Sequence, residues 1–342
     1  MVDPFVLLLI VLFLAVSFDF INGFHDTANA IATVVATRVL TPTQAILMAS
    51  TLNFAGAMTG TAVAKTISKG LIDAELATQP LIISALAAAI VWNLITWFYG
   101  IPSSSSHALI GGIVGAAIAE AGSFGAPKWG TVVQKVLIPL VVSPVIGFCM
   151  AWAIMIVLLR VFIRRTPGGV QRTFGKWQLL SSAFMAFSHG GNDAQKTMGV
   201  MTLAIASYMF TTQGVPIPAD LVVPMWIKLV AAIAMGLGTA AGGWRVIKTM
   251  GHKLARLQPI HGFAAETAAA TIIEIASRFG FPLSTTHVIS SAIMGAGASR
   301  GLSAVRWNVA GSIVTAWILT IPACMTLAAG FFILLRAVLR LP

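Results

Sequence analysis

The sequence predicts an all-α polytopic membrane protein with two inverted-topology repeats and about 10–12 transmembrane segments, including broken or re-entrant helices. Of 342 residues, 58% are hydrophobic and only 9% are charged, whereas about 25% are charged in ordinary soluble proteins. Apolar runs such as 81–99 and 313–335 recur along the chain, and about 20 helical residues cross a hydrocarbon core. Two motif pairs also recur in the same order in both halves. This composition argues against a disordered chain and against a soluble enzyme.

The net charge of +11 is carried by short loops between the apolar runs, a pattern typical of topology determinants and not of nucleic-acid binding. Segment 160–176 is basic and contains no acid, so we expect it on the cytoplasmic side, together with 245–256 and 300–306. The equivalent first-half loop, 65–75, has balanced charge and is expected on the other side. Equivalent loops on opposite sides indicate inverted repeats, each with an odd number of crossings.

These charges divide the chain into a first inverted repeat at 1–159, a basic cytoplasmic linker at 160–176 and a second inverted repeat at 177–342. Five crossings in each half fit the apolar runs. The expected spans are 4–36, 43–62, 80–98, 103–119 and 130–158, followed by 177–206, 225–243, 259–277, 282–299 and 307–335.

Two pairs of motifs indicate an internal duplication. Gly100–His107 resembles Gly280–His287, and Asn22–Asn29 resembles His189–Lys196. Chance similarity between apolar helices could produce one such match, but two matches in the same order, with Asp and His aligned, favour a true repeat.

Glycine and proline predict breaks at matching places in the halves. Gly23 lies midway along the first run, Gly190 and Gly191 lie similarly in 177–206, and a Gly-x-Pro precedes both 103–119 and 282–299. Irregular backbone at membrane depth is tolerated only where it lines a cavity or is buried in protein. Paired breaks therefore predict a binding site at the repeat interface. The last two segments could be spanning or re-entrant.

Acidic residues in apolar surroundings are the main functional signal. Asp19, Asn22, Asp26 and Asn29 are spaced by 3, 4 and 3 residues, which places them on one helical stripe. A charge at the bilayer centre costs about 2.5–3.5 kcal/mol even on the gentler insertion scale. A structural hydrogen-bond seam could explain one such copy. Because Asp193 stands at the matching position of the second copy, we favour an ion site.

The hydroxyl segments Ser103–Ser106 and Ser284–Thr286 each follow a proline, which suits the first turn of a helix. Hydroxyls and free N–H groups at a helix start can hold an anion. The alternative is ordinary N-capping, which requires a single hydroxyl. Two such hydroxyl segments, one from each inverted repeat, would converge on one anion.

Glu266 follows a His261-Gly262 break and is a further candidate cation ligand. The spacing of the Cys and His residues does not fit a zinc site.

These motifs resemble the signatures of the inorganic phosphate transporter (PiT) family over nearly the whole chain. The family's acidic motif stands here as Gly23–Ala30 and Gly190–Thr197, and its Pro-x-Ser-x-Thr-His segment as Pro102–His107 and Pro282–His287. The resemblance implies secondary transport of phosphate with sodium or protons, inverted repeats and a homodimer. Lys196 departs from the family pattern, because it replaces the second Asn of the motif and makes the two copies chemically unequal.

On this basis Asp26 and Asp193 take the coupling-ion role and the hydroxyl segments take the phosphate role. The expected phosphate-binding residues are Thr27, Ser104, Ser105, Ser106, Gln195, Ser284, Thr285 and Thr286. The expected cation-binding residues are Asp26, Asn29, Asn192, Asp193 and Glu266. No cofactor, no metal beyond sodium and no nucleic acid is expected.

We therefore predict a multi-pass protein of the cell (inner) membrane, not an enzyme, that imports phosphate by symport with a cation through alternating access. Oxygen ligands from Asp, Asn, Ser and Thr favour sodium over protons. The nearest alternative is a permease for sulfate or another tetrahedral oxyanion. A different class, an intramembrane aspartyl protease using Asp26 and Asp193, would leave the duplicated hydroxyl segments unexplained.

Overall fold

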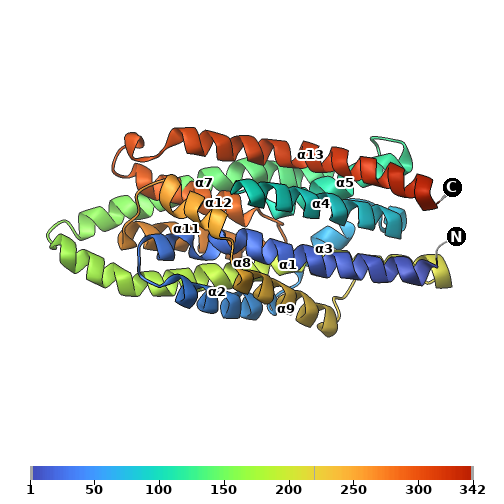
Figure 1. Ribbon diagram of the computed structural model, residues 1–342, viewed down its shortest axis with the longest axis horizontal. Coiled ribbons are helices and arrows are strands. Elements are labelled where there is room, and N and C mark those ends of the chain that lie inside the picture. Colours follow the sequence, from blue (N-terminus) through green and yellow to red (C-terminus); the bar gives the residue numbers. More distant parts are fainter. Residues whose placement is uncertain (1–2, 219, 340–342) are drawn as a thin grey trace.

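The computed structural model describes residues 3–218 and 220–339, which form helices joined by short loops (Figure 1). No strand occurs in these ranges, so the prediction of an all-α protein is confirmed. The longer helices are α1 (Pro4–Ala36), α2 (Pro42–Ala57), α3 (Ala62–Lys69), α4 (Gln79–Tyr99), α5 (Ser105–Ala121), α7 (Ile138–Val161), α8 (Pro167–Gln213), α9 (Met225–Ala241), α11 (Pro259–Arg278), α12 (Thr285–Ala298) and α13 (Trp307–Leu339). Shorter helical pieces are η1 (Ala74–Leu76), α6 (Trp129–Val132), η2 (Val133–Leu137), α10 (Trp244–Lys248), η3 (Thr249–Lys253) and η4 (Leu302–Ala304).

The helices begin where capping residues stand in the sequence. Thr41 caps α2 in a capping box with Gln44, and Thr166 caps α8 by accepting a hydrogen bond from the Gly169 amide. A proline follows each of these threonines, in the first turn, where its missing N–H costs nothing. Most of the predicted spans and the observed helices start within about three residues of each other, whereas α8 begins at Pro167, ten residues before the predicted start at 177.

Four of the helical stretches are long and apolar enough to cross a membrane: α1, α4, α13 and the continuous stretch Trp129–Val161. Two further candidate spans each consist of two helical pieces that meet at a bend. The bend between α2 and α3 is 69°, and the bend between α9 and the α10–η3 stretch is 61°. Helix α12 has 14 residues, a length of about 21 Å, which is less than a hydrocarbon core of about 30 Å. An extended lead-in and a short helix fit the re-entrant alternative for 282–299. The number of crossings stays a prediction.

Helices α1 and α8 run without interruption through Gly23 and through Gly190 and Gly191, so the predicted breaks there are wrong. These glycines serve close helix packing instead. A Cβ at Gly23 would lie 2.6 Å from the Met235 carbonyl oxygen on α9. A Cβ at Gly190 would collide with the backbone of Asn53 on α2. Small residues let membrane helices approach closely, and here they do so at α1–α9 and at α2–α8.

The basic segment 160–176 is mostly helical, because α7 ends at Val161 and α8 begins at Pro167. Only residues 162–166 separate the two helices. Figure 1 shows this connection at one end of the molecule, near the start of α13, whereas both termini lie at the opposite end, where α4 begins. This arrangement agrees with the predicted charge map, which puts 160–176 and 300–306 on one side and 65–75 on the other.

The two halves interlock. Helix α1 packs on α9, and α2 packs on α8; α5 packs on α13, and α7 packs on α12. These four helix pairs each join one half to the other, whereas α4 packs mainly on α5 and α11 mainly on α8, within their own halves. The halves also repeat local structure: an isolated antiparallel bridge joins Ile72 to Pro127 and another joins Ala255 to Val305. These matching features support the predicted duplication, and the opposite orientation of the repeats stays a prediction.

Candidate functional site

The two motif aspartates come together at the buried centre of the molecule. Asp26 lies on α1 and Asp193 on α8, and with His189 they offer ligand atoms that all lie within 4.8 Å of one another. All three side chains are buried. Two ionised carboxylates with oxygens within 4.8 Å of each other repel by about 3–4 kcal/mol or more at an effective dielectric constant of about 20, so this pair favours a bound cation. Acidic side chains from the two halves therefore meet in one cluster, at the kind of interface where the sequence predicts a binding site.

Asp193 has three partners. Its Oδ1 contacts the ammonium of Lys196, one turn further along α8. Its Oδ2 accepts a hydrogen bond of 3.3 Å from the hydroxyl of Thr285 and lies 3.4 Å from Nε2 of His189. The carboxylate is therefore linked to a hydroxyl segment on α12 and carries its own lysine counter-charge.

Asp26 has a different environment. Its Oδ1 lies 2.5 Å from Nδ1 of His25. The other ring nitrogen of His25 lies 3.1 Å from the hydroxyl of Thr96 on α4 and 3.4 Å from the hydroxyl of Ser103. Thr96 was not identified from the sequence, because nothing local distinguishes it from other hydroxyl residues in apolar helices. The one sequence signal for a polar network around Asp26 was the neighbouring residue His25. No lysine or arginine whose side chain the structure describes forms an ion pair with Asp26.

One hydroxyl in each hydroxyl segment is an N-cap. Ser104 accepts a hydrogen bond of 3.2 Å from the amide of His107 at the start of α5, and Ser284 accepts one of 3.2 Å from the amide of His287 at the start of α12. Capping therefore accounts for these two residues. It does not account for the hydroxyls that follow them.

The hydroxyls of Thr285, Thr286 and Ser106 contact the acidic motifs. Asn29 donates hydrogen bonds to the hydroxyls of Thr285, at 3.2 Å, and Thr286, at 2.9 Å. Ser106 contacts the ammonium of Lys196 and donates to the Leu283 carbonyl at 3.1 Å. Each acidic motif thus contacts the hydroxyl segment of the other half.

Ser105 lies between Ser104 and Ser106 in the first hydroxyl segment. Its hydroxyl is buried and has no hydrogen-bond partner in the part of the chain that the structure describes. Because buried hydroxyls are usually paired, this oxygen is available to a ligand held between the two hydroxyl segments.

Thr27 and Gln195 bond to backbone groups away from the hydroxyl segments. The Thr27 hydroxyl donates to the Gly23 carbonyl at 2.7 Å. The Gln195 carbonyl oxygen accepts from the Val63 amide at 2.9 Å, which satisfies a free N–H at the start of α3. The geometry gives no support to a phosphate role for either residue.

Two predicted cation ligands, Glu266 and Asn192, form hydrogen bonds to groups outside the aspartate pair. Glu266 on α11 accepts hydrogen bonds from the hydroxyls of Thr33 and Ser181 and, at 3.1 Å, from the amide of Gln178. Asn192 donates to the Ser277 hydroxyl at 2.8 Å. The carboxylate of Glu266 therefore joins α1, α8 and α11 in a second polar cluster, and the structure does not bring it to Asp26 and Asp193.

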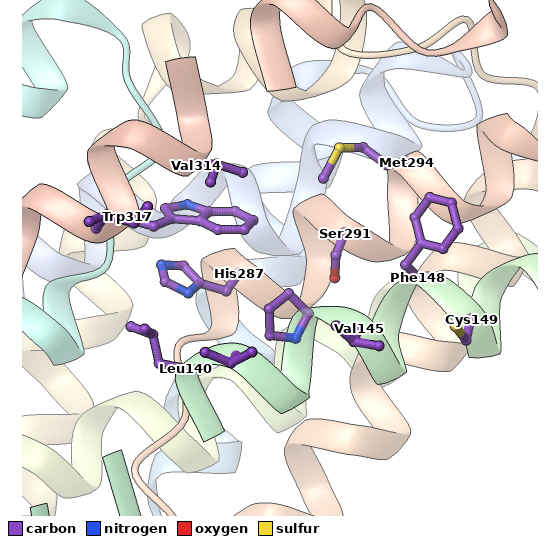
Figure 2. A pocket seen from close by; sticks show the side chains of 12 residues that line it. Leu140, Val145, Phe148, Cys149, His287, Ser291, Met294, Val314 and Trp317 are labelled. Carbon is purple, nitrogen blue, oxygen red and sulfur yellow. The ribbon is translucent and has the colours of Figure 1, made fainter. Parts of the chain in front are cut away.

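The histidines that close the hydroxyl segments meet each other. The rings of His107 and His287 lie 4.9 Å apart, and His287 stacks on Trp317 at 4.0 Å. Figure 2 shows His287 and Trp317 at a groove of about 410 Å³ that is also lined by Ser291. The rest of this groove between α7, α12 and α13 is apolar, so it is not suited to hold a phosphate.

Comparison with known proteins gives a consistent result. The profile of the phosphate transporter family matches residues 22–168 and 164–328. A protein of Rhizobium meliloti (strain 1021), named "Probable low-affinity inorganic phosphate transporter", is 45% identical over 326 residues, which cover 95% of each chain. A protein of Bacillus subtilis (strain 168) with the same name is 44% identical over 332 residues, covering 96% of this chain and 97% of its own. A solved structure named "The sodium-dependent phosphate transporter" superposes with a TM-score of 0.85 at 28% identity and covers 97% of this chain and 99% of its own.

Proposed function

Because this chain belongs to the phosphate transporter family, we propose that it imports inorganic phosphate by symport with a cation, sodium in preference to protons, through alternating access. The members of the family are transporters and not enzymes, so the aspartyl protease alternative is set aside. The membrane is proposed to be the cell (inner) membrane, and the working unit a homodimer.

One observation carries the proposal: each acidic motif contacts the hydroxyl segment of the opposite half. Asn29 on α1 reaches Thr286 on α12, and Lys196 on α8 reaches Ser106 on α5. Binding sites of secondary transporters lie at the interface between repeats, where short helix starts face the substrate. An anion between Ser105–Ser106 and Thr285–Thr286 would touch both halves at once, which is the condition for a site that opens alternately to the two sides.

The aspartate pair supplies the coupling-cation role in this proposal. Carboxylate, amide and hydroxyl oxygens suit a hard cation, and Asp26 and Asp193 stand next to the proposed anion position. Moving phosphate into a cell with an inside-negative potential is uphill, and each co-transported cation contributes about 2.3 kcal/mol per 100 mV. The solved relative is named as sodium-dependent, and this property of a similar protein supports sodium here.

The proposal is tested by uptake of radiolabelled phosphate into proteoliposomes with the sodium gradient and the proton gradient imposed separately. We expect accumulation driven by an inward sodium gradient and by an inside-negative potential. Accumulation with a proton gradient alone would assign the coupling to protons. Sulfate, offered in excess as the competing tetrahedral oxyanion, is expected to leave phosphate uptake unchanged, and strong competition would favour a broader oxyanion permease.

A further inference from the structure

Lys196 is a fully buried lysine in the middle of α8. Lysine is almost never fully buried unless its charge is paired. Its ammonium contacts the carboxylate of Asp193 and the hydroxyl of Ser106. The side chain therefore places a positive charge between the second acidic motif and the hydroxyl segment of the first half.

The equivalent residue of the first motif is Asn29, which stands three positions after Asp26 as Lys196 stands three positions after Asp193. The two side chains make equivalent contacts, because Asn29 reaches Thr286 and Lys196 reaches Ser106, the matching residue of the other hydroxyl segment. The geometry of the two copies is thus repeated, but their charge is not. The first copy has a neutral amide where the second has an ammonium.

We infer that Lys196 is a tethered cation, which takes the place of a mobile sodium ion in the second copy and serves as a direct phosphate ligand. The inference rests on the proposed function, since it concerns how many cations accompany phosphate. Asp193 has its counter-charge built in, whereas Asp26 has no lysine or arginine partner among the side chains that the structure describes. A mobile cation is therefore required at Asp26 and is displaced at Asp193.

The chemistry of the ammonium supports the ligand role. An ammonium has three N–H donors and no acceptor, and Asp193 and Ser106 account for two of them. The third donor is left for a phosphate oxygen, and the hydroxyl segment that Lys196 contacts also holds the unpartnered hydroxyl of Ser105. A lysine binds phosphate as a point charge. Because this cation stays attached to the protein, it does not leave with the substrate.

The test uses two substitutions at Lys196 and one matched control. Lys196→Asn gives the second copy the residue of the first, Lys196→Met removes the charge and supplies no oxygen ligand, and Lys65→Asn makes the same exchange at a half-exposed ion pair with Asp220. Phosphate binding to the purified proteins is measured over a range of sodium concentrations, with melting temperatures alongside.

We expect Lys196→Asn to weaken phosphate binding by about 10- to 150-fold at low sodium, the loss expected for a hydrogen bond to a charged group. At high sodium the binding should recover, and the slope of log affinity against log sodium should rise by about one, because one more ion now binds by mass action. Lys196→Met should not recover, and Lys65→Asn should match the wild type. Wild-type affinity and slope in Lys196→Asn would overturn the inference.

A wild-type measurement decides the matter if neither Lys196 variant folds. The slope of log phosphate affinity against log sodium should be about one in the wild-type protein, because Asp26 takes a mobile ion and Lys196 replaces the other. A slope of about two, in a protein whose melting temperature responds to phosphate with sodium present, would overturn the inference. A protein that neither binds nor transports phosphate under any condition would instead overturn the proposed function.

Discussion

The side-chain amide of Asn29 donates a 2.9 Å hydrogen bond to the hydroxyl of Thr286, and this bond joins α1 of the first half to α12 of the second. The contact between Lys196 and Ser106 joins α8 to α5 in the matching way. Each acidic motif also contacts the hydroxyl segment of its own half, through Asp193 and Thr285 in the second half and through His25 and Ser103 in the first. A substrate held by these groups would therefore couple the positions of the two halves, as alternating access requires.

Asp26→Asn and Asp193→Asn each remove one charge from the proposed cation site and keep its size. We expect sodium-driven phosphate uptake to collapse in both variants. Asp193→Asn should also lower the melting temperature, because it leaves Lys196 buried without a counter-charge, and breaking a buried ion pair costs about 3–5 kcal/mol. Asp220→Asn, at an exposed position, is the control. Normal sodium-driven uptake in either aspartate variant would remove that residue from the cation site.

Ser105→Ala and Thr285→Ala test the anion site. A lost hydrogen bond to a charged group reduces affinity by about 10- to 150-fold, so both variants should bind phosphate more weakly in saturating sodium. The two residues share one ligand, so the losses in the double variant should not be additive. Phosphate binding and melting temperature are measured on the same preparations.

Ser104→Ala separates ligand binding from helix capping. Ser104 caps α5 through the amide of His107, and loss of such a cap costs about 1 kcal/mol of stability. We expect a lower melting temperature with phosphate affinity nearly unchanged, the opposite of the pattern for Ser105→Ala. If Ser105→Ala and Thr285→Ala lose only stability and keep their affinity, the hydroxyl segments are caps and do not bind phosphate.

Local signals predicted most of the fold, whereas long-range contacts were not accessible from the sequence. Apolar runs located most of the helices, and the motif copies predicted a binding site at the interface between the repeats. The interpretation of Gly23 as a break was wrong, because a glycine within a helix is a break or a packing contact depending on a partner far away in the chain, here Met235. The partners of Glu266 were hidden for the same reason.

Gly190→Ala tests the packing explanation of the central glycines. A Cβ at Gly190 would collide with backbone atoms of Asn53, which cannot rotate away. Inserting a methyl group into such a contact costs about 1–3 kcal/mol, so we expect a clear fall in melting temperature. Gly311→Ala is the control: a Cβ at Gly311 on α13 meets nothing within 4 Å, and alanine there should be neutral or stabilising by about 0.5–1 kcal/mol. Equal stability of the two variants would contradict the packing explanation.

Glu266→Gln decides between the two roles available to Glu266. The carboxylate accepts hydrogen bonds from Thr33, Gln178 and Ser181, and a glutamine offers only one oxygen and adds two donors. At least one buried donor would then lose its acceptor, which costs about 1–3 kcal/mol. We therefore expect a lower melting temperature and an unchanged sodium dependence of phosphate binding.

Glu274→Gln provides the matched control for this prediction, because Glu274 lies two turns further along α11 in an ion pair with the exposed Arg278. Exposed ion pairs contribute about 0–1 kcal/mol, so this variant should behave almost as the wild type does. A reduced sodium dependence in Glu266→Gln with its melting temperature unchanged would show that Glu266 binds a cation, as the sequence predicted. In that case the protein would hold a cation at a second position, separate from the pair of aspartates.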